Sequence, residues 1–535
     1  MPGVSAQKDA FVRSALPPRA QWPALIFTLP ELQFPDQLNA SMLLDRACSG
    51  GMSENTAVLW SGGRLSYAQL LEKVNRIANV LVADMGLKPG NRVLLHAPNT
   101  PTMLAAWWAV LRAGGVAVAT MPMLRTPELK VIIDKALISH ALVHTSLNAE
   151  FEPARFAGGH IRKALTFGGD DTELAQRAAA ASPEFEPTPT ANDDPAIVAF
   201  TSGTTGKPKG CVHFHRDILA MAETFSRHVL RPKPGDVFCG TPPFAFTFGL
   251  GASVVFPAAV GAATALPIKP GFDALADTIA EHRATTLFTS PTGYRALLKI
   301  ADDRLSSLHT CVSAGEHLPK ATSDAWCDRT GIRIIDGIGS TELIHIFISA
   351  SGEDIRAGAT GKVVPGYEAC VLDEDDRPID GSGQGRLAIK GPTGCRYLAD
   401  DRQGAYVVNG WNVTGDIYRV DDKGYFWFVS RADDMIISAG YNIAAPEVEN
   451  ALLQHRNVAE AAVIGAPDAE RGQIVKAFVV LREADPTDAL KKELQDFVKR
   501  TIAPYKYPRA IEFVTELPKT QTGKLQRFRL REPQA

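Results

Sequence analysis

The chain has 535 residues, of which 45% are hydrophobic and 21% are charged, and its formal net charge is −3. This length calls for two or more domains, and the near balance of charge argues against nucleic acid or an anionic membrane as a partner. The seven scattered cysteines form no CxxC pair and the first residues lack an apolar signal segment, so we expect a cytoplasmic protein without a disulfide framework.

Apolar, strand-like runs alternate with helical patterns through the first two thirds of the chain. The alternating segments lie at residues 92–96, 105–113, 116–120, 272–283, 286–290, 310–314 and 333–336. Such alternation predicts βαβ units, in which helices cover parallel β-sheets.

A loop rich in glycine, hydroxyl groups and lysine follows an apolar strand predicted at residues 197–200. It reads Thr-Ser-Gly-Thr-Thr-Gly-Lys-Pro-Lys-Gly from residue 201 to residue 210. Glycines let backbone N–H groups converge on an anion, while hydroxyls and lysines add donors and positive charge. The alternative is a flexible linker, but a linker has no need of a preceding strand. The loop predicts a polyphosphate site, although Pro208 departs from the P-loop pattern and argues against a P-loop kinase or GTPase.

The region around residue 250 combines phenylalanines with an uncharged stretch. Phe244, Phe246 and Phe248 recur at period two, which by itself favours one buried face of a strand, and the alternative is a flat aromatic slot. Residues 249–268 carry no charge, so a membrane span must be considered. Their Gly, Ala and Pro content predicts a packed interior or a pocket wall rather than a bilayer helix.

Two changes of pattern divide the last third of the chain. After Gly361, short strands at 369–373, 385–390 and 424–429 predict a small antiparallel subdomain. Beyond residues 430–434, a compact α+β unit is predicted from a helix, two strands and an amphipathic helix at 446–455, 459–464, 475–481 and 488–500. We therefore expect an α/β protein with a large domain, residues 1–431, and a small mobile domain, residues 432–535.

Three short motifs would each be ambiguous alone. Residues 336–342 place a hydroxyl and a carboxylate after a glycine-rich strand exit, 414–416 place a carboxylate in a tight turn, and 518–524 place a lysine on a glycine turn. The alternatives are ordinary turns, caps and a solvated surface lysine.

Together and in this order, the motifs resemble the acyl-adenylate-forming superfamily of acyl-CoA synthetases, luciferases and peptide-synthetase adenylation domains. The resemblance runs from about Leu44 to Lys524. The segments 75–81, 114–122 and 339–347 are most similar to benzoate-CoA and 2-aminobenzoate-CoA ligases, and residues 243–251 favour the 2-aminobenzoate branch.

The resemblance implies ATP, Mg²⁺ and coenzyme A as reactants and cofactors, and it assigns the nucleotide site. The ATP phosphates would contact Thr201, Ser202, Gly203, Thr204, Thr205, Gly206, Lys207 and Lys209. The adenosine would contact Gly315, Glu316, Asp336, Gly337, Ile338, Asp416 and Arg431, the last two at the ribose. Ile338 stands where many members have an aromatic residue that stacks on adenine; the benzoate-like branch shares this departure.

The resemblance also assigns the catalytic groups and the moving parts. Thr341 would contact the α-phosphate, Glu342 would help to bind Mg²⁺, and Lys524 would bridge the acid carboxylate and the α-phosphate. Asp433 matches the hinge position, although a solvated acidic turn is the alternative for Asp433–Asp434. The pantetheine tunnel would be lined by Gly440 and Tyr441.

The acid pocket is expected at Phe246, Thr247, Phe248, Gly249, Gly339 and His345. Phe246 would gate the thiol tunnel, and Gly249 and Gly251 would let a planar ring approach the backbone. A lone histidine in an apolar stretch is usually a satisfied core group, but the resemblance places His345 near the bound acid.

The sequence thus predicts an AMP-forming aryl-CoA ligase that acts on 2-aminobenzoate, then benzoate or a hydroxybenzoate. Alternatives are an enzyme that loads an aryl acid onto a carrier-protein thiol, a fatty-acid ligase, and a non-catalytic nucleotide-binding protein of the same fold. The partners expected are a small aromatic carboxylic acid, ATP and CoA, with neither nucleic acid nor membrane; a homodimer is an open alternative.

Overall fold

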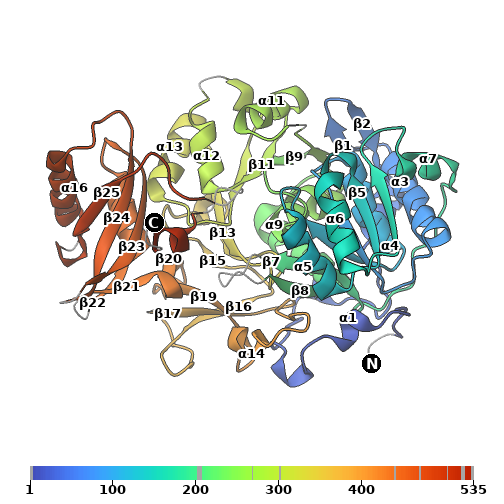
Figure 1. The fold of residues 1–535 in the computed structure, drawn as a ribbon, viewed down its shortest axis with the longest axis horizontal. Coiled ribbons are helices and arrows are strands. Elements are labelled where there is room, and N and C mark those ends of the chain that lie inside the picture. The colour runs from blue at the N-terminus through green and yellow to red at the C-terminus, as the bar shows by residue number, and fades with distance from the viewer. Residues whose placement is uncertain are drawn as a thin grey trace.

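Three β-sheets build the large N-terminal part of the chain, and a smaller α+β unit follows it at the C-terminal end (Figure 1). The computed structural model describes residues 4–201, 208–267, 269–300, 303–438, 441–468, 471–502, 504–519 and 525–531. The predicted α/β class, with a large parallel-sheet part and smaller sheets toward the C-terminus, is confirmed.

The first sheet has six strands. The two strands that flank the predicted phosphate loop form a hairpin at one edge of this sheet. The strands run in the order β6 (Lys163–Phe167), β5 (His140–His144), β3 (Arg92–His96), β4 (Val116–Thr120), β7 (Pro195–Thr201) and β8 (Lys209–Phe214). They are parallel except for β8, which is antiparallel to β7. Every residue of β3 is buried, as expected for a strand covered on both faces.

Helices connect and flank these parallel strands. They are α3 (Tyr67–Asn79), α4 (Pro101–Arg112), α5 (Thr126–Ala136), α6 (Asn148–Gly158) and α7 (Glu173–Ala180). Helix α4 begins four residues before its predicted start, because the Thr100 side chain accepts a hydrogen bond from the Met103 N–H and Pro101 occupies the first turn.

The second sheet has nine strands and carries the 336–342 motif. Its order is β15 (Lys362–Val363), β14 (Ile346–Ser349), β13 (Ile335–Gly339), β12 (Thr310–Ser313), β11 (Thr286–Thr289), β9 (Val237–Gly240), β10 (Ala263–Ala265), β1 (Thr56–Trp60) and β2 (Gly63–Ser66). The central strands are parallel, and antiparallel strands close both ends. The accompanying helices are α8 (His215–Met221), α9 (Thr247–Leu250), α10 (Phe256–Val260), α11 (Phe272–His282), α12 (Pro291–Leu297) and α13 (Lys320–Thr330).

An antiparallel sheet follows, as predicted after Gly361. It contains β16 (Glu368–Leu372), β17 (Gly383–Lys390), β18 (Val407–Val408), β19 (Trp411–Val420) and β20 (Phe426–Arg431). Strand β20 extends to Arg431 because that residue still pairs with Asp416 of β19.

The C-terminal unit is built on a three-stranded sheet and a separate hairpin. Strands β23 (Val458–Asp468) and β24 (Gly472–Leu481) form an antiparallel pair, β25 (Ala510–Phe513) lies parallel to β24, and the hairpin joins β21 (Met435–Ser438) and β22 (Tyr441–Ala444). Its helices are α15 (Ala445–Leu453), α16 (Asp488–Thr501) and α17 (Arg527–Arg531). Helix α16 starts at a Thr487 cap and buries Leu490, Leu494 and Val498 at four-residue spacing, which is one helix face.

The segment 520–524 lies between two described residues that pair with each other. Lys519 and Leu525 form an antiparallel bridge, and the Gln526 N–H donates to the Pro518 carbonyl at 2.8 Å. Arg527 and Arg531 of α17 then bind Asp434, at 3.1 and 2.7 Å. The base of this segment is therefore fastened within the C-terminal unit.

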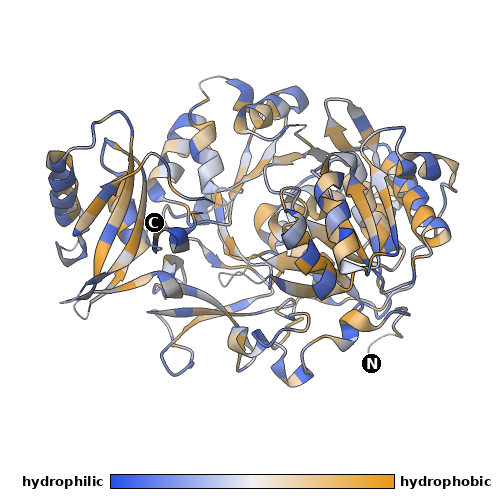
Figure 2. Cartoon of the chain, viewed as in Figure 1, coloured by the Kyte–Doolittle hydropathy of each residue, from blue (hydrophilic) through white to orange (hydrophobic). Residues whose placement is uncertain are grey.

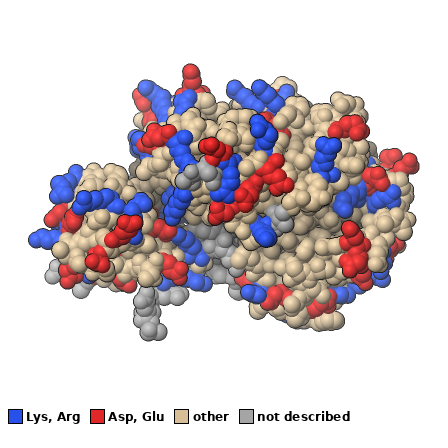
Figure 3. All heavy atoms as spheres, turned by 90° about the horizontal axis from the view of Figure 1, so that it is seen from above, with Lys and Arg blue, Asp and Glu red and all other residues tan. Residues whose placement is uncertain are grey.

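Apolar and charged side chains are distributed differently over the described residues. Apolar residues concentrate in the strands and inner helix faces (Figure 2), and on the face in Figure 3 basic and acidic side chains are interspersed. Within the described ranges, no helix combines the length and the hydrophobicity that crossing a membrane requires. The uncharged stretch 249–268 contains the end of α9, then α10 and β10, and all residues from Gly249 to Ala258 are buried, in agreement with the packed interior predicted for it.

Candidate active site

The residues that flank the predicted phosphate loop belong to two paired strands. Thr201 at the end of β7 pairs with Lys209 at the start of β8. Residues Ser202, Gly203, Thr204, Thr205, Gly206 and Lys207 lie outside the described residues. The predicted strand before the loop is confirmed, and the strand that follows the loop runs back antiparallel to it.

A chain of hydrogen bonds joins this hairpin to the carboxylate of the 336–342 motif. The Lys209 ammonium donates to the Tyr397 hydroxyl at 3.2 Å, and that hydroxyl donates to Glu342 Oε1 at 2.6 Å. Glu342 is only 9% exposed, and Tyr397 is fully buried. The structure thus brings together the predicted Lys209 and Glu342 through a tyrosine that the sequence analysis missed.

A second buried network holds the residue before Glu342. The Nε2–H of His213 donates to the Thr341 carbonyl at 2.7 Å, and His213 Nδ1 lies 3.6 Å from the Asp217 carboxylate. Asp217 in turn forms an ion pair with Arg396, and the His213, Asp217 and Arg396 side chains are all fully buried. The catalytic dipeptide predicted at 341–342 is therefore held from two sides.

The residues predicted to frame adenine lie at adjacent strand ends. Gly315 follows β12 with φ +89°, a left-handed conformation that favours glycine, and Glu316 accepts a hydrogen bond from the Thr292 hydroxyl at 2.9 Å. Asp336 and Gly337 lie in β13, which pairs with β12. Ile338 follows in the same strand and packs partly buried against the main core.

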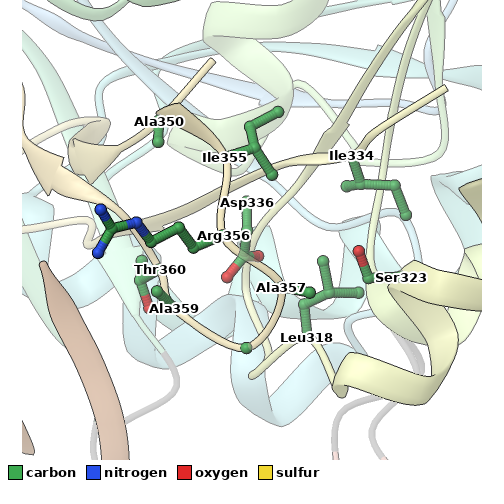
Figure 4. A pocket seen from close by; sticks show the side chains of 11 residues that line it. Leu318, Ser323, Ile334, Asp336, Ala350, Ile355, Arg356, Ala357, Ala359 and Thr360 are labelled. Atoms are coloured by element: carbon green, nitrogen blue, oxygen red, sulfur yellow. The ribbon is translucent and has the colours of Figure 1, made fainter. Parts of the chain in front are cut away.

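Asp336 faces a small pocket whose other walls the sequence analysis did not identify (Figure 4). Burial raises the pKa of Asp336 to about 8, against the opposing effect of the Gly337 N–H and Ser313. Near neutral pH this carboxyl therefore keeps its proton, so it offers one donor and one acceptor. The pocket is lined by Leu318, Ser323, Ile334, Asp336, Ala350, Ile355, Arg356, Ala357, Gly358, Ala359 and Thr360.

The predicted ribose residues are direct neighbours across two strands. Asp416 of β19 and Arg431 of β20 are paired in register, and Arg431 Nη1 donates to Asp416 Oδ1 at 3.1 Å. Asp416 is 8% exposed and follows Gly415, whose φ is +77°. Thr414, Gly415 and Asp416 lie within β19, so the tight turn expected at 414–416 is wrong. The paired strands themselves place the carboxylate and the guanidinium side by side.

The phenylalanine repeat is not a strand. Phe246 precedes α9, and Thr247, Phe248 and Gly249 lie in that helix, so the strand alternative suggested by period two is wrong. Pro242 and Pro243 occupy the segment just before it, and the Asn99 side chain holds that segment by a bond to the Pro242 carbonyl at 3.2 Å and a bond from the Phe244 N–H at 3.0 Å. Three phenylalanines at alternate positions are too few to distinguish a strand from a turn that leads into a helix.

The glycines of this region do not open space for a ligand ring. A Cβ on Gly249 would lie 2.2 Å from the Pro243 carbonyl oxygen, and a Cβ on Gly251 would lie 2.5 Å from the His345 ring. Gly339 likewise lies against the backbone of His345, whose carbonyl oxygen would be 2.7 Å from its Cβ. At Gly249 and Gly251 the space that a Cβ would occupy is therefore filled by the protein itself, and both glycines allow close packing there.

His345 lies at the centre of an aromatic cage. Its ring centroid is 4.6 Å from that of Phe256, 5.3 Å from Phe225 and 5.8 Å from Phe248. The side chain is 3% exposed, and within the described part of the chain neither ring nitrogen has a hydrogen-bond partner. Burial lowers the pKa of His345 to about 3, opposed by the Phe248 backbone, so the imidazole is neutral.

The backbone before His345 is strained. Ile344 has φ +66° and is fully buried, and a β-branched residue in the left-handed region is uncommon. This turn aims His345 into the cage while Thr341 and Glu342 face the hairpin.

The predicted hinge lies where the C-terminal unit begins. Asp433 lies in a short 3-10 helix, Ala432–Asp434, directly after β20, while its side chain is outside the described set. Gly440 and Lys524 also lie outside the described residues, and Tyr441 is described only as the first residue of β22.

A contact between Asn450 and His317 links the C-terminal unit to the nucleotide side of the large part. Asn450 Nδ2 of α15 lies 3.4 Å from His317 Nε2, and the His317 ring stacks on Phe428 at 5.2 Å. Burial lowers the pKa of His317 to about 4, so this histidine is neutral near pH 7.

Comparison with known proteins places this geometry in a family. The profile of the AMP-binding enzyme family matches residues 44–397, and that of the AMP-binding enzyme C-terminal domain matches residues 447–524. The chain belongs to the AMP-binding enzyme family. The predicted class, an adenylate-forming acid–thiol ligase, is confirmed at this level.

Relatives in this family include aryl-CoA ligases. Benzoate–CoA ligase of Thauera aromatica is 35% identical over 514 residues, which cover 94% of this chain and 98% of that protein. An anthranilate CoA ligase in complex with anthranoyl-AMP has a similar structure, with a TM-score of 0.89 and 33% identity over 94% of this chain and 98% of that one. A benzoate CoA ligase from Burkholderia xenovorans has a TM-score of 0.84 and 32% identity over 92% and 100%. The resemblance to the benzoate-CoA and 2-aminobenzoate-CoA ligase group is confirmed.

Proposed function

We propose that this member of the AMP-binding enzyme family is an ATP-dependent aryl-CoA ligase that prefers 2-aminobenzoate, then benzoate or a hydroxybenzoate. In the first step a carboxylate oxygen attacks the α-phosphorus of ATP, the bond to the β-phosphate oxygen breaks, and pyrophosphate leaves. In the second step the CoA thiolate attacks the acyl carbonyl, and AMP leaves. The relatives named as benzoate and anthranilate CoA ligases support this class of acid, since anthranilate is 2-aminobenzoate.

The observation that carries the choice of acid is the buried imidazole of His345, to which no side chain among the described residues forms a hydrogen bond. A buried polar group without a hydrogen bond lowers the stability of the fold by about 1–3 kcal/mol. A ligand that forms the missing hydrogen bond would recover part of this cost. The neutral ring offers one donor and one acceptor within a cage of phenylalanines, which suits an aromatic acid with an ortho amino or hydroxyl group.

The nucleotide would lie between the hairpin tip and the ends of β12 and β13. The residues from Thr201 to Lys209 would hold the β- and γ-phosphates, and Thr341 would contact the α-phosphate. The protonated carboxyl of Asp336 can both donate to and accept from the edge of adenine. Asp416 and Arg431, already side by side, would take the ribose hydroxyls.

The side chains present fit a magnesium ion that arrives with ATP. No group of three or more His, Cys, Asp or Glu side chains within the described ranges could hold a metal by itself. Mg²⁺ is typically bound by one or two carboxylates together with substrate phosphates, and Glu342 supplies one carboxylate beside the hairpin. When bound there, the ion would neutralise phosphate charge, and Glu342 would fix its place.

The small C-terminal unit would serve both steps in two orientations. Lys524 would approach the acid and the α-phosphate in the first step, and Gly440 and Tyr441 would line the thiol's path in the second. Asp433 would be the pivot, because hinge residues at element ends absorb the backbone change in such motions.

Replacing His345 with alanine should reduce kcat/KM for 2-aminobenzoate about fivefold more than kcat/KM for benzoate. The reason is that only the ortho amine can donate to the imidazole, and one such hydrogen bond contributes about 1 kcal/mol. CoA-dependent AMP release, measured with each acid and with the hydroxybenzoates, checks this expectation.

The matched control for that variant is Phe256→Leu, which opens the same cage but keeps the imidazole. It should change both acids by similar factors. Equal losses of kcat/KM on both acids in His345→Ala would contradict the proposed contact.

A separate experiment tests the ligase reaction itself. It compares the rate of acyl transfer to free CoA with the rate of transfer to a carrier-protein thiol.

A further inference from the structure

Tyr397 lies between the two segments that the proposed function assigns to phosphate and metal. The segment around it runs along β8: the Val212 N–H donates to the Arg396 carbonyl, and the Leu398 N–H donates to the Gly210 carbonyl, both at 2.8 Å. Its backbone is therefore fixed to the strand that leaves the phosphate loop.

The Tyr397 side chain then spans the gap to the carboxylate. Its hydroxyl donates to Glu342 Oε1 at 2.6 Å and receives a hydrogen bond from Lys209 Nζ at 3.2 Å. A carboxylate oxygen can only accept a hydrogen bond, so the Tyr397 hydroxyl is the donor in its bond to Glu342. The ring packs edge-on against Tyr406, with centroids 5.8 Å apart.

We propose that Tyr397 is a positioning residue, which orients the Glu342 carboxylate toward the metal ion of the nucleotide and ties that carboxylate to Lys209 of the phosphate-loop hairpin. The inference rests on the proposed function, which gives Glu342 its metal role. Because the hydroxyl takes Oε1, Oε2 is the oxygen that would meet the cation. Outer hydrogen bonds of this type set the direction and basicity of a ligand, and their loss typically costs 10- to 100-fold in metal affinity.

The first test is Tyr397→Phe, which removes the hydroxyl and keeps the ring. The Mg²⁺ concentration for half-maximal acid-dependent exchange of pyrophosphate into ATP should rise about 10- to 100-fold, while KM for the acid changes less than about twofold, because the acid does not touch Tyr397. Binding of Mn²⁺ to the enzyme with ATP, followed by electron paramagnetic resonance, should weaken by the same factor. Unchanged Mn²⁺ binding would overturn the proposal.

The second test asks whether Tyr397 acts through Glu342. Glu342→Gln and the double variant Glu342→Gln/Tyr397→Phe should show the same Mn²⁺ affinity, because the hydroxyl has no carboxylate left to orient. Effects that multiply in the double variant would show that the two residues act independently, and the proposal would fail.

Two controls keep structural damage apart from the proposed role. Tyr67→Phe removes another buried hydroxyl, which donates to the Ala262 carbonyl at 2.7 Å, and it should leave Mn²⁺ binding unchanged. Tyr397→His keeps a ring with an N–H donor and should bind Mn²⁺ several-fold better than Tyr397→Phe; an equal loss in both would count against positioning. If the wild-type protein shows no acid-dependent exchange, the proposed function fails, and the Mn²⁺–ATP binding of these variants still decides the role of Tyr397.

Discussion

Replacing Lys524 with alanine should abolish acyl-AMP formation, while the transfer of a supplied acyl-AMP to CoA continues. In the proposed first step two anions, the acid and the α-phosphate, must meet, and a cation between them offsets their repulsion. Removing one such electrostatic group typically costs about 10²–10³-fold in rate. In the second step the lysine has no comparable task, so a loss of less than about threefold is expected there.

The two half-reactions can be measured separately. Acid-dependent exchange of labelled pyrophosphate into ATP reports the first step, and CoA consumption with synthetic acyl-AMP reports the second. Lys519→Ala is the matched control, because Lys519 is five residues earlier in the same segment and pairs with Glu460 at 2.5 Å. Equal loss of both half-reactions in Lys524→Ala would contradict the proposal of two orientations.

Asp217→Ala should destabilise the large part of the protein by about 3–5 kcal/mol. Asp217 and Arg396 form a fully buried ion pair, so the variant leaves an uncompensated guanidinium in the interior. Burial acts to raise the pKa of Asp217, but Arg396 and His213 outweigh it and hold the pKa below its ordinary value. A loss of this size is a large share of a typical stability of about 5–15 kcal/mol.

Tryptophan fluorescence can follow the unfolding of the large part selectively, because all seven tryptophans precede residue 430.

The double variant Asp217→Leu/Arg396→Met should lower the free energy of unfolding less than Asp217→Ala does, since it removes both charges. Asp496→Ala, which breaks the exposed pair with Lys499, should leave the stability almost unchanged. If Asp217→Ala lowers the free energy of unfolding by less than about 1 kcal/mol, the Arg396 guanidinium is compensated by other groups in the variant.

Patterns that repeat over many residues predicted the architecture well. The mainly apolar strands and the helical patterns of the first two thirds recur as β3, β4, α11 and β11, within a few residues of their expected bounds. The spacing of apolar residues follows directly from which face of a helix or strand is buried, so it can be recognised in the sequence. The motif 336–342 was also placed correctly, at the exit of β13.

Short or non-local features escaped prediction. Three phenylalanines at alternate positions suggested a strand, but the segment after two prolines and before a glycine begins the helix α9 instead. Tyr397 and His213 reach Glu342 and Thr341 across 55 and 128 positions of the chain. A single tyrosine or histidine carries no periodicity, so such contacts become visible only when the fold brings the segments together.

The antiparallel bridge between Lys519 and Leu525 joins the two described residues that flank 520–524. Arg527 and Arg531 of α17 form ion pairs with Asp434, the residue beside the proposed pivot, so the described residues after this segment are tied to the start of the C-terminal unit. In the proposed enzyme the C-terminal unit would then rotate as one body. Salt concentration, through these arginine contacts, should therefore change the speed of alternation between the half-reactions more than the chemistry of either one.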